Sequence, residues 1–264
     1  MLYAMPYCSV DDIELYYQEE GSGPPLLLIH GLGSSRRDWF EQVDHFKDRY
    51  RVLRVDLRGH GRSGRGEGPY HIAQFARDVA VFLRRVNAVP AHVVGLSMGG
   101  MVALQLGADA PGLVRSLVVV NSLVDAELQT WGDLWFYVSR RAAIRVLGME
   151  RVGEILADRL FVKPDQEDLR RGFVERWSQN DKQAYLWSMD AIIGWSIWDR
   201  LSAIPAPALI VSSDEDYTPV AEKRRMVTEM PRAELAVVED ARHALPVEKP
   251  EAFNKVAERF LGEK

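Results

Sequence analysis

Short apolar runs recur along the chain, and the stretches between them are polar or carry apolar residues at a helical spacing. A run that is apolar at nearly every position is typical of a strand with both faces covered by other parts of the protein. Such runs lie at 26–29, 52–55, 91–94, 117–120, 208–212 and 235–238. Near the start, 7–10 and 13–18 flank the turn residues Asp11-Asp12 and predict a hairpin of two further strands.

Helices are predicted between these strands. Residues 72–87 show the spacing of three and four that is typical of a helix with one buried face, carried by Phe75, Val79, Phe82, Leu83 and Val86. A last helix is predicted from Pro250, because proline is favoured at the first helical position, to about Leu261. Strands that alternate with helices predict an α/β fold, with a mostly parallel sheet covered by helices on both faces.

Residues 131–201 interrupt this alternation. The segment has no strand-like run, holds six of the seven tryptophans, and has helix-favouring stretches at 138–147, 152–160 and 169–177. We therefore expect a core domain formed by residues 1–130 and 202–264, with a helical cap formed by 131–201 over the carboxyl ends of the strands. Most of these tryptophans should pack the cap against the core, while one or two line an apolar substrate pocket. The candidates for that role are Trp131, Trp135 and Trp187.

Composition narrows the class of partner. The chain has 264 residues, 47% of them hydrophobic, so it can bury a sizeable core. Its formal charge of −5 argues against nucleic acid or an anionic membrane surface as the main partner. The single cysteine, Cys8, cannot form an internal disulfide, and the first residues lack the features of a signal peptide. No apolar run approaches the length of a membrane span. We expect a soluble, cytoplasmic protein that acts on a small molecule.

The sequence Gly95-Leu96-Ser97-Met98-Gly99-Gly100 carries the first chemical signal. It follows the predicted strand 91–94 and opens a helix-like stretch, which is the context in which G-x-S-x-G presents a nucleophilic serine. Glycine is required on both sides of Ser97 because side chains in so tight a turn would collide with the adjoining strand and helix. The same string arises by chance in glycine-rich turns, so a base, an acid and an oxyanion site have to be found elsewhere.

A serine hydroxyl is a weak nucleophile and needs an adjacent base to take its proton. His243 is the candidate base, because it lies in the loop between the last predicted strand and the last helix. Strand 208–212 is followed by three carboxylates within three positions, Asp214, Glu215 and Asp216. Side-chain alternation does not separate Asp214 from Asp216, because the two positions have the same parity.

These motifs together resemble the α/β-hydrolase superfamily. The resemblance covers residues 13–261 and rests on the serine turn, His30-Gly31-Leu32-Gly33, the segment from Asp56 to Ser63, and His243 ahead of Glu248-Lys249-Pro250. It implies a triad in the chain order serine, acid, histidine. When Ser213 is placed on the glycine of the family pattern, the acid is Asp216, although Pro219 then arrives one residue early; Asp214 is the alternative. The resemblance also implies an oxyanion hole made by the backbone N–H groups of Leu32 and Met98.

The implied reaction follows from the nucleophile. A serine excludes the superfamily branches that use aspartate there, and the motifs are most similar to small carboxylesterases and 3-oxoadipate enol-lactonases. The resemblance therefore implies hydrolysis of a carboxylic ester or lactone through an acyl-enzyme. Carbon–carbon bond hydrolases of ring-cleavage products usually carry Asn and Trp where this chain has Leu96 and Ala244. Perhydrolase or haloperoxidase-like chemistry is a further alternative, and a ligand receptor built on the fold is the non-enzymatic one. The histidines lack metal-ligand spacing, so we expect no metal and no cofactor.

Overall fold

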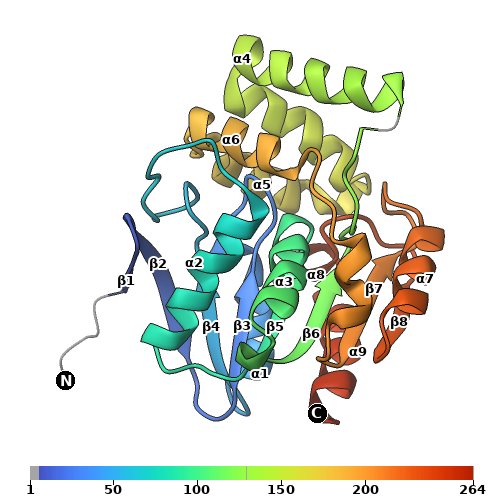
Figure 1. Ribbon diagram of the computed structural model, residues 1–264. Coiled ribbons are helices and arrows are strands. Elements are labelled where there is room, and N and C mark those ends of the chain that lie inside the picture. The colour runs from blue at the N-terminus through green and yellow to red at the C-terminus, as the bar shows by residue number, and fades with distance from the viewer. Residues whose placement is uncertain (1–5, 129, 264) are drawn as a thin grey trace.

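The eight strands in the described part of the chain form one sheet (Figure 1). The computed structural model describes residues 6–128 and 130–263. In the sheet the strands lie in the order β1 (Tyr7–Val10), β2 (Ile13–Glu20), β4 (Arg51–Val55), β3 (Pro25–Ile29), β5 (Ala91–Leu96), β6 (Val114–Val120), β7 (Ala208–Ser213) and β8 (Ala233–Val238). β1 and β2 pair antiparallel with their neighbours, and all pairs from β4 to β8 are parallel. The carboxyl ends of the parallel strands therefore share one edge.

Helices cover both faces of this sheet. One hydrophobic core lies between the sheet and α2 (Ile72–Arg85), α3 (Met98–Asp109) and α7 (Val220–Glu229). The other lies against α1 (Phe40–Phe46), α8 (Leu245–Glu248) and α9 (Pro250–Gly262). Leu27 and Ile29 of β3 belong to the first core, whereas Leu26 and Leu28 belong to the second. This alternation explains why the run is apolar at every position, and each buried leucine contributes roughly 2 kcal/mol to stability. The predicted fold class is confirmed.

Three helices of the described ranges lie above the carboxyl ends of the strands, and we refer to them as the cap: α4 (Trp131–Leu160), α5 (Glu167–Ser178) and α6 (Lys182–Ile192) (Figure 1). α4 is two helices joined at Gly148, whose φ of 80° departs from helical geometry, and its arms contain the predicted stretches 138–147 and 152–160. A separate small core, which includes Ile144, Val152 and Trp177, holds the cap together. None of the helices in the described ranges is long and apolar enough to cross a membrane.

Sequence patterns missed the elements with the least regular apolar spacing. α1, α6, α7 and α8 were not predicted. Within the described ranges, short 3-10 helices lie at Arg36–Trp39, Pro111–Leu113, Pro164–Gln166 and Trp198–Ala203. α6 has a local signal that explains its start, because the side chain of Asp181 accepts a hydrogen bond from the N–H of Ala184 at 2.7 Å. α2 ends at Arg85, two residues before the predicted end at 87. Asn87 has a φ of 52°, which is incompatible with a right-handed helix.

Candidate active site

Ser97 occupies a strained turn between β5 and α3. Its φ of 54° and ψ of −118° are rare for a residue with a side chain. The flanking glycines allow the turn: a Cβ on Gly95 would lie 2.2 Å from the carbonyl oxygen of Gly99, and one on Gly99 would lie 2.3 Å from that of Ile29. The N–H of Ser97 donates to the carbonyl of Val120 at 2.9 Å, which anchors the turn to β6. The serine is thus held rigidly at the carboxyl edge of the sheet.

His243 and Asp216 form a direct pair beside this turn. Nδ1 of His243 lies 2.7 Å from Oδ1 of Asp216, whose side chain has no exposed surface. Burial acts to raise the pKa of Asp216, but hydrogen bonds from His243 and Thr218 and the charge of Lys223 outweigh it, so the pKa falls below its usual range. Asp214 is exposed and instead accepts a hydrogen bond from the N–H of Ala241 at 3.2 Å. Of the two candidate acids, Asp216 is the one that contacts His243.

A buried chain of polar groups supports the carboxylate of Asp216 from behind. The hydroxyl of Thr218 donates to Oδ2 of Asp216, and Nζ of Lys223 lies 2.5 Å from that hydroxyl. Lys223 is fully buried, and burial lowers the pKa of its ammonium group. Because the carboxylate and the ammonium share Thr218, Lys223 fixes the orientation of Asp216 without touching His243.

Asn121 ties together the two loops that carry the acid and the histidine. It follows β6, and its Nδ2 lies 3.0 Å from the carbonyl oxygen of His243 and 2.9 Å from Oγ of Ser213. Its Oδ1 accepts the N–H of Ser213 at 2.8 Å. One amide side chain therefore sets the spacing between the end of β7 and the histidine loop.

Tyr217 lies directly over the imidazole. The two rings are stacked with their centroids 4.1 Å apart, and the phenol oxygen is 2.5 Å from Nε2 of His243. Tyr217 is 68% exposed, and its hydroxyl also contacts the side chain of Ser97. Among the described hydrogen bonds none joins Ser97 Oγ to His243, so the phenol occupies the place where these two groups would meet.

The candidate oxyanion donors have free N–H groups. Neither the N–H of Leu32 nor that of Met98 donates a hydrogen bond within the described part of the chain. His30 sets the direction of the Leu32 N–H: its Nδ1 lies 2.8 Å from the carbonyl oxygen of Gly31, and its Nε2 accepts the N–H of Leu57 at 3.0 Å. Because the Gly31 carbonyl and the Leu32 N–H belong to one planar trans peptide, they point in opposite directions. The buried His30 thus orients that peptide.

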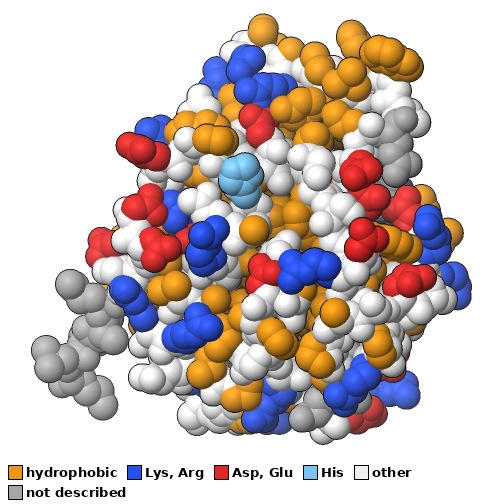
Figure 2. Space-filling model, in the orientation of Figure 1, with side chains coloured by type: hydrophobic (Ala, Val, Ile, Leu, Met, Phe, Trp, Pro, Cys, Tyr) orange, Lys and Arg blue, Asp and Glu red, His pale blue; other side chains and the backbone are white. Residues whose placement is uncertain are grey.

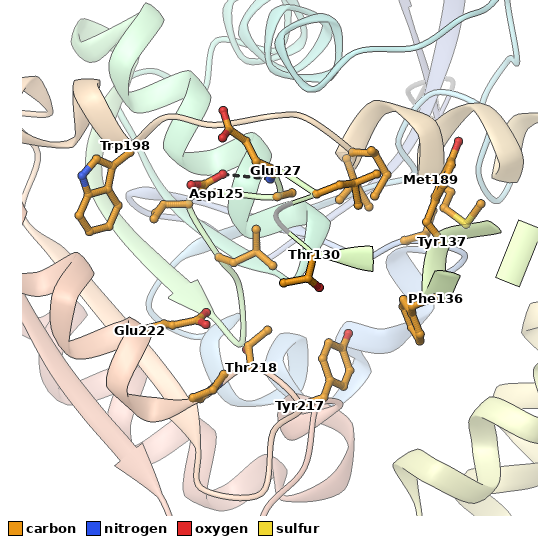
Figure 3. Close-up of a pocket in the computed structure, with 18 of the residues that line it drawn as sticks. Asp125, Glu127, Thr130, Phe136, Tyr137, Met189, Trp198, Tyr217, Thr218 and Glu222 are labelled. Atoms are coloured by element: carbon orange, nitrogen blue, oxygen red, sulfur yellow. Dashed lines mark hydrogen bonds between the residues drawn. The ribbon is translucent and has the colours of Figure 1, made fainter. Parts of the chain in front are cut away.

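A cavity of about 640 Å³ lies between the cap and the strand ends (Figure 3). It is bounded by Leu32 and Tyr217 at the core and by Phe136, Arg140 and Met189 from the cap. Ser97 and His243 are not among its described lining residues, but Tyr217 lines it and contacts His243. Tyr217 therefore stands between the cavity and the serine–histidine pair.

The three tryptophans that we expected to line a pocket lie elsewhere. Trp131 and Trp135 are 87% and 72% exposed on the outer surface of α4, where apolar side chains gather (Figure 2). Trp187 packs against Tyr70, with ring centroids 5.3 Å apart. The tryptophan that does line the cavity is Trp198. Trp131 and Trp135 lie on α4, which carries apolar side chains on both its outer and inner surfaces, so the sequence pattern does not mark which surface faces the core. Trp187 lies on α6.

Comparison with known proteins identifies the family. The model described as "Alpha/beta hydrolase family" matches residues 26–256. The chain belongs to this family.

Relatives of this α/β hydrolase match over nearly their whole length. A protein of Azorhizobium caulinodans with the provisional name carbamate hydrolase RutD is 30% identical, over 98% of this chain and 99% of that protein. The 3-oxoadipate enol-lactonase 2 of Acinetobacter baylyi is 29% identical, over 96% of this chain and 95% of that protein. Among solved structures, the enol-lactonase from Burkholderia xenovorans LB400 has a TM-score of 0.89 at 27% identity, covering 97% of this chain and 100% of that chain. The predicted resemblance is confirmed.

Sequence reasoning missed four residues that shape the site of this α/β hydrolase: Asn121, Arg140, Tyr217 and Lys223. Asn121 had the one usable signal, since it directly follows an apolar strand at the carboxyl edge. Arg140 lies in a predicted helical stretch and Lys223 in a helix that was not predicted. The sequence pattern marks neither charge, and only the packing of α7 buries Lys223 and only the packing of α4 places Arg140 at the cavity.

Proposed function

We propose that this α/β hydrolase is a serine hydrolase that cleaves a carboxylic ester or lactone through an acyl-enzyme. The observation that carries the proposal is the pair formed by His243 and Asp216 beside a serine in a strained strand-to-helix turn. The two side chains are 2.7 Å apart, and that of Asp216 has no exposed surface. A buried carboxylate at this distance keeps the proton of the imidazole on Nδ1 and leaves Nε2 free to act as a base. The enol-lactonase relatives cleave, by their names, the kind of bond that such a site attacks.

The reaction starts with Ser97. Nε2 of His243 takes the proton of the serine hydroxyl as Oγ attacks the substrate carbonyl, and Asp216 stabilises the imidazolium that forms. The negative charge that develops on the carbonyl oxygen is accepted by the N–H groups of Leu32 and Met98. For this step the phenol of Tyr217 has to leave Nε2, because it occupies the position that the serine hydroxyl must take.

The second half of the reaction reverses the proton transfers. The imidazolium of His243 protonates the leaving alkoxide, so the alcohol departs and an acyl group stays on Ser97. A water molecule then gives a proton to Nε2 while its oxygen attacks the acyl carbon through a second oxyanion. Collapse of that intermediate returns the proton to Ser97 and releases the carboxylic acid. With a lactone, the alcohol and the acid are two ends of one product.

Release of p-nitrophenol from p-nitrophenyl acetate tests this assignment. The wild type should show turnover, and Ser97→Ala should abolish it, because the acyl-enzyme can no longer form. Ser178→Ala, which changes an exposed serine in the cap, is the matched control and should keep the wild-type rate. Mass spectrometry after treatment with a fluorophosphonate should place the added group on Ser97. An unchanged rate in Ser97→Ala would refute the proposal, and absence of turnover and of labelling in the wild type would favour a ligand receptor.

A further inference from the structure

Arg140 extends from α4 into the cavity above the candidate catalytic residues. Its guanidinium is held by one tyrosine: Nη2 and Nε lie 2.7 and 3.1 Å from the hydroxyl of Tyr185, which is itself buried. An arginine is charged at every physiological pH. Burial raises the pKa of Tyr185, so its hydroxyl stays neutral and does not compensate that charge.

The charge of Arg140 has no carboxylate partner within the described residues. The next residue, Arg141, shows the contrast, because its guanidinium is paired with Asp190. Arg140 is half-buried and lines the cavity, so its guanidinium is accessible to an anion that enters there. Tyr185 engages Nε and Nη2, so Nη1 and the second proton of Nη2 remain as a fork of the geometry that suits a carboxylate.

The opposite side of the same cavity is acidic. Asp125, Glu127 and Glu222 lie there together with Trp198, whereas Phe136, Tyr137 and Met189 lie on the other side (Figure 3). The one basic residue that lines the acidic part among the described residues, Arg225, is placed over the ring of Trp198 at 4.9 Å. Arg140 lies on α4 one turn after Phe136 and Tyr137, so the cavity has a basic side and an acidic side.

We propose that Arg140 binds a carboxylate of the substrate, so that the enzyme acts on esters or lactones that carry an anionic end. The inference rests on the proposed hydrolase activity and specifies its substrate class. An anion is drawn to the side of Phe136, Tyr137 and Arg140 and repelled from the side of Asp125, Glu127 and Glu222. The substrate therefore enters in one orientation, and a second anionic group at its far end weakens binding.

Three p-nitrophenyl esters with six-carbon acyl groups test this subsite. They differ only at the far end: p-nitrophenyl hexanoate ends in a methyl group, mono-p-nitrophenyl adipate in a carboxylate, and p-nitrophenyl 6-aminohexanoate in an ammonium group. The wild type should have the highest kcat/KM on the adipate and the lowest on the aminohexanoate. Arg140→Met should lower kcat/KM on the adipate by about 100-fold, which is typical for loss of an enclosed charge pair, and change the hexanoate by less than about threefold.

Two further variants separate recognition from folding. Arg145→Met removes an exposed arginine of the same helix and should leave all three rates unchanged. Arg140→Lys keeps the charge but not the fork, and should restore part of the preference for the adipate. Equal losses on all three esters in Arg140→Met, or equal wild-type rates on hexanoate and adipate, would overturn the proposal.

Binding without turnover distinguishes a failure of the subsite from a failure of the hydrolase assignment. Monomethyl adipate is titrated calorimetrically into Ser97→Ala and into Ser97→Ala combined with Arg140→Met. Binding by the first protein and about 100-fold weaker binding by the second supports the subsite even if no ester is cleaved. Equal binding by the two proteins refutes the subsite even if the esters are cleaved.

Discussion

Replacing Asp216 by asparagine tests the electrostatic core of the proposed mechanism. The carboxylate lies 2.7 Å from Nδ1 of His243 and has no exposed surface. An amide of the same size keeps the packing but removes the negative charge. It also presents a neutral oxygen or a second donor to Nδ1, so the imidazolium loses its stabilisation and the imidazole its fixed tautomer.

The expected loss is large because the pair is buried. In serine hydrolases the equivalent change lowers kcat by about 10⁴-fold, which corresponds to about 5 kcal/mol of transition-state stabilisation. Thr218 and Lys223 do not replace the lost charge, because one is neutral and the other positive. We therefore expect Asp216→Asn to retain roughly one ten-thousandth of the wild-type kcat on a p-nitrophenyl ester.

Asp214→Asn is the matched control. Asp214 is exposed and accepts a hydrogen bond from the N–H of Ala241 at 3.2 Å, which an amide oxygen can still accept. Its kcat should stay within about twofold of the wild type, as for most exposed substitutions away from the chemistry. Thermal unfolding of both variants excludes misfolding as the cause of a loss. Collapse of activity in Asp214→Asn, with Asp216→Asn active, would move the role to Asp214 and refute the reasoning from the buried pair.

Two other substitutions test the contact of Tyr217 with the imidazole and the tight turn at Ser97, the second with a matched control. Tyr217→Phe removes the hydroxyl that occupies Nε2 of the imidazole. In the wild type this neutral hydrogen bond, worth about 1 kcal/mol, must break before the reaction, whereas in the variant it is absent. The kcat/KM on a neutral ester should therefore rise about fivefold. A tenfold fall would instead show that the phenol assists the reaction. Gly99→Ala places a Cβ 2.3 Å from a backbone carbonyl of β3 and should lower the free energy of unfolding in urea by about 3 kcal/mol. Gly112→Ala, with nothing within 4 Å, should change it by less than about 1 kcal/mol; equal values for the two variants would contradict the steric argument.

The local sequence pattern was sufficient to predict those features that depend only on residues close together in the chain. Apolar runs of four or five residues predict the strands, because successive positions of a strand such as β3 meet the two cores in turn. The turn at Ser97 was readable for the same reason: the two glycines that its geometry requires are its near neighbours in the chain. The position of His243 between the last strand and the last helix followed from the order of the elements.

Tertiary structure decided everything that depends on which side chains meet across the fold. Asp214 and Asp216 are equivalent in the pattern, and only the path of the loop after β7, tied to the histidine loop by Asn121, brings Asp216 to His243. Trp131 and Trp135 lie exposed and do not line the described cavity, because an apolar helix does not encode which of its sides faces the core. The same packing sets Arg140 in the cavity without a carboxylate partner among the described residues and places Tyr217 over the imidazole. The sequence alone thus determined the family and was sufficient to propose a nucleophile and a base, whereas the shape and charge of the cavity arise from contacts between residues far apart in the chain.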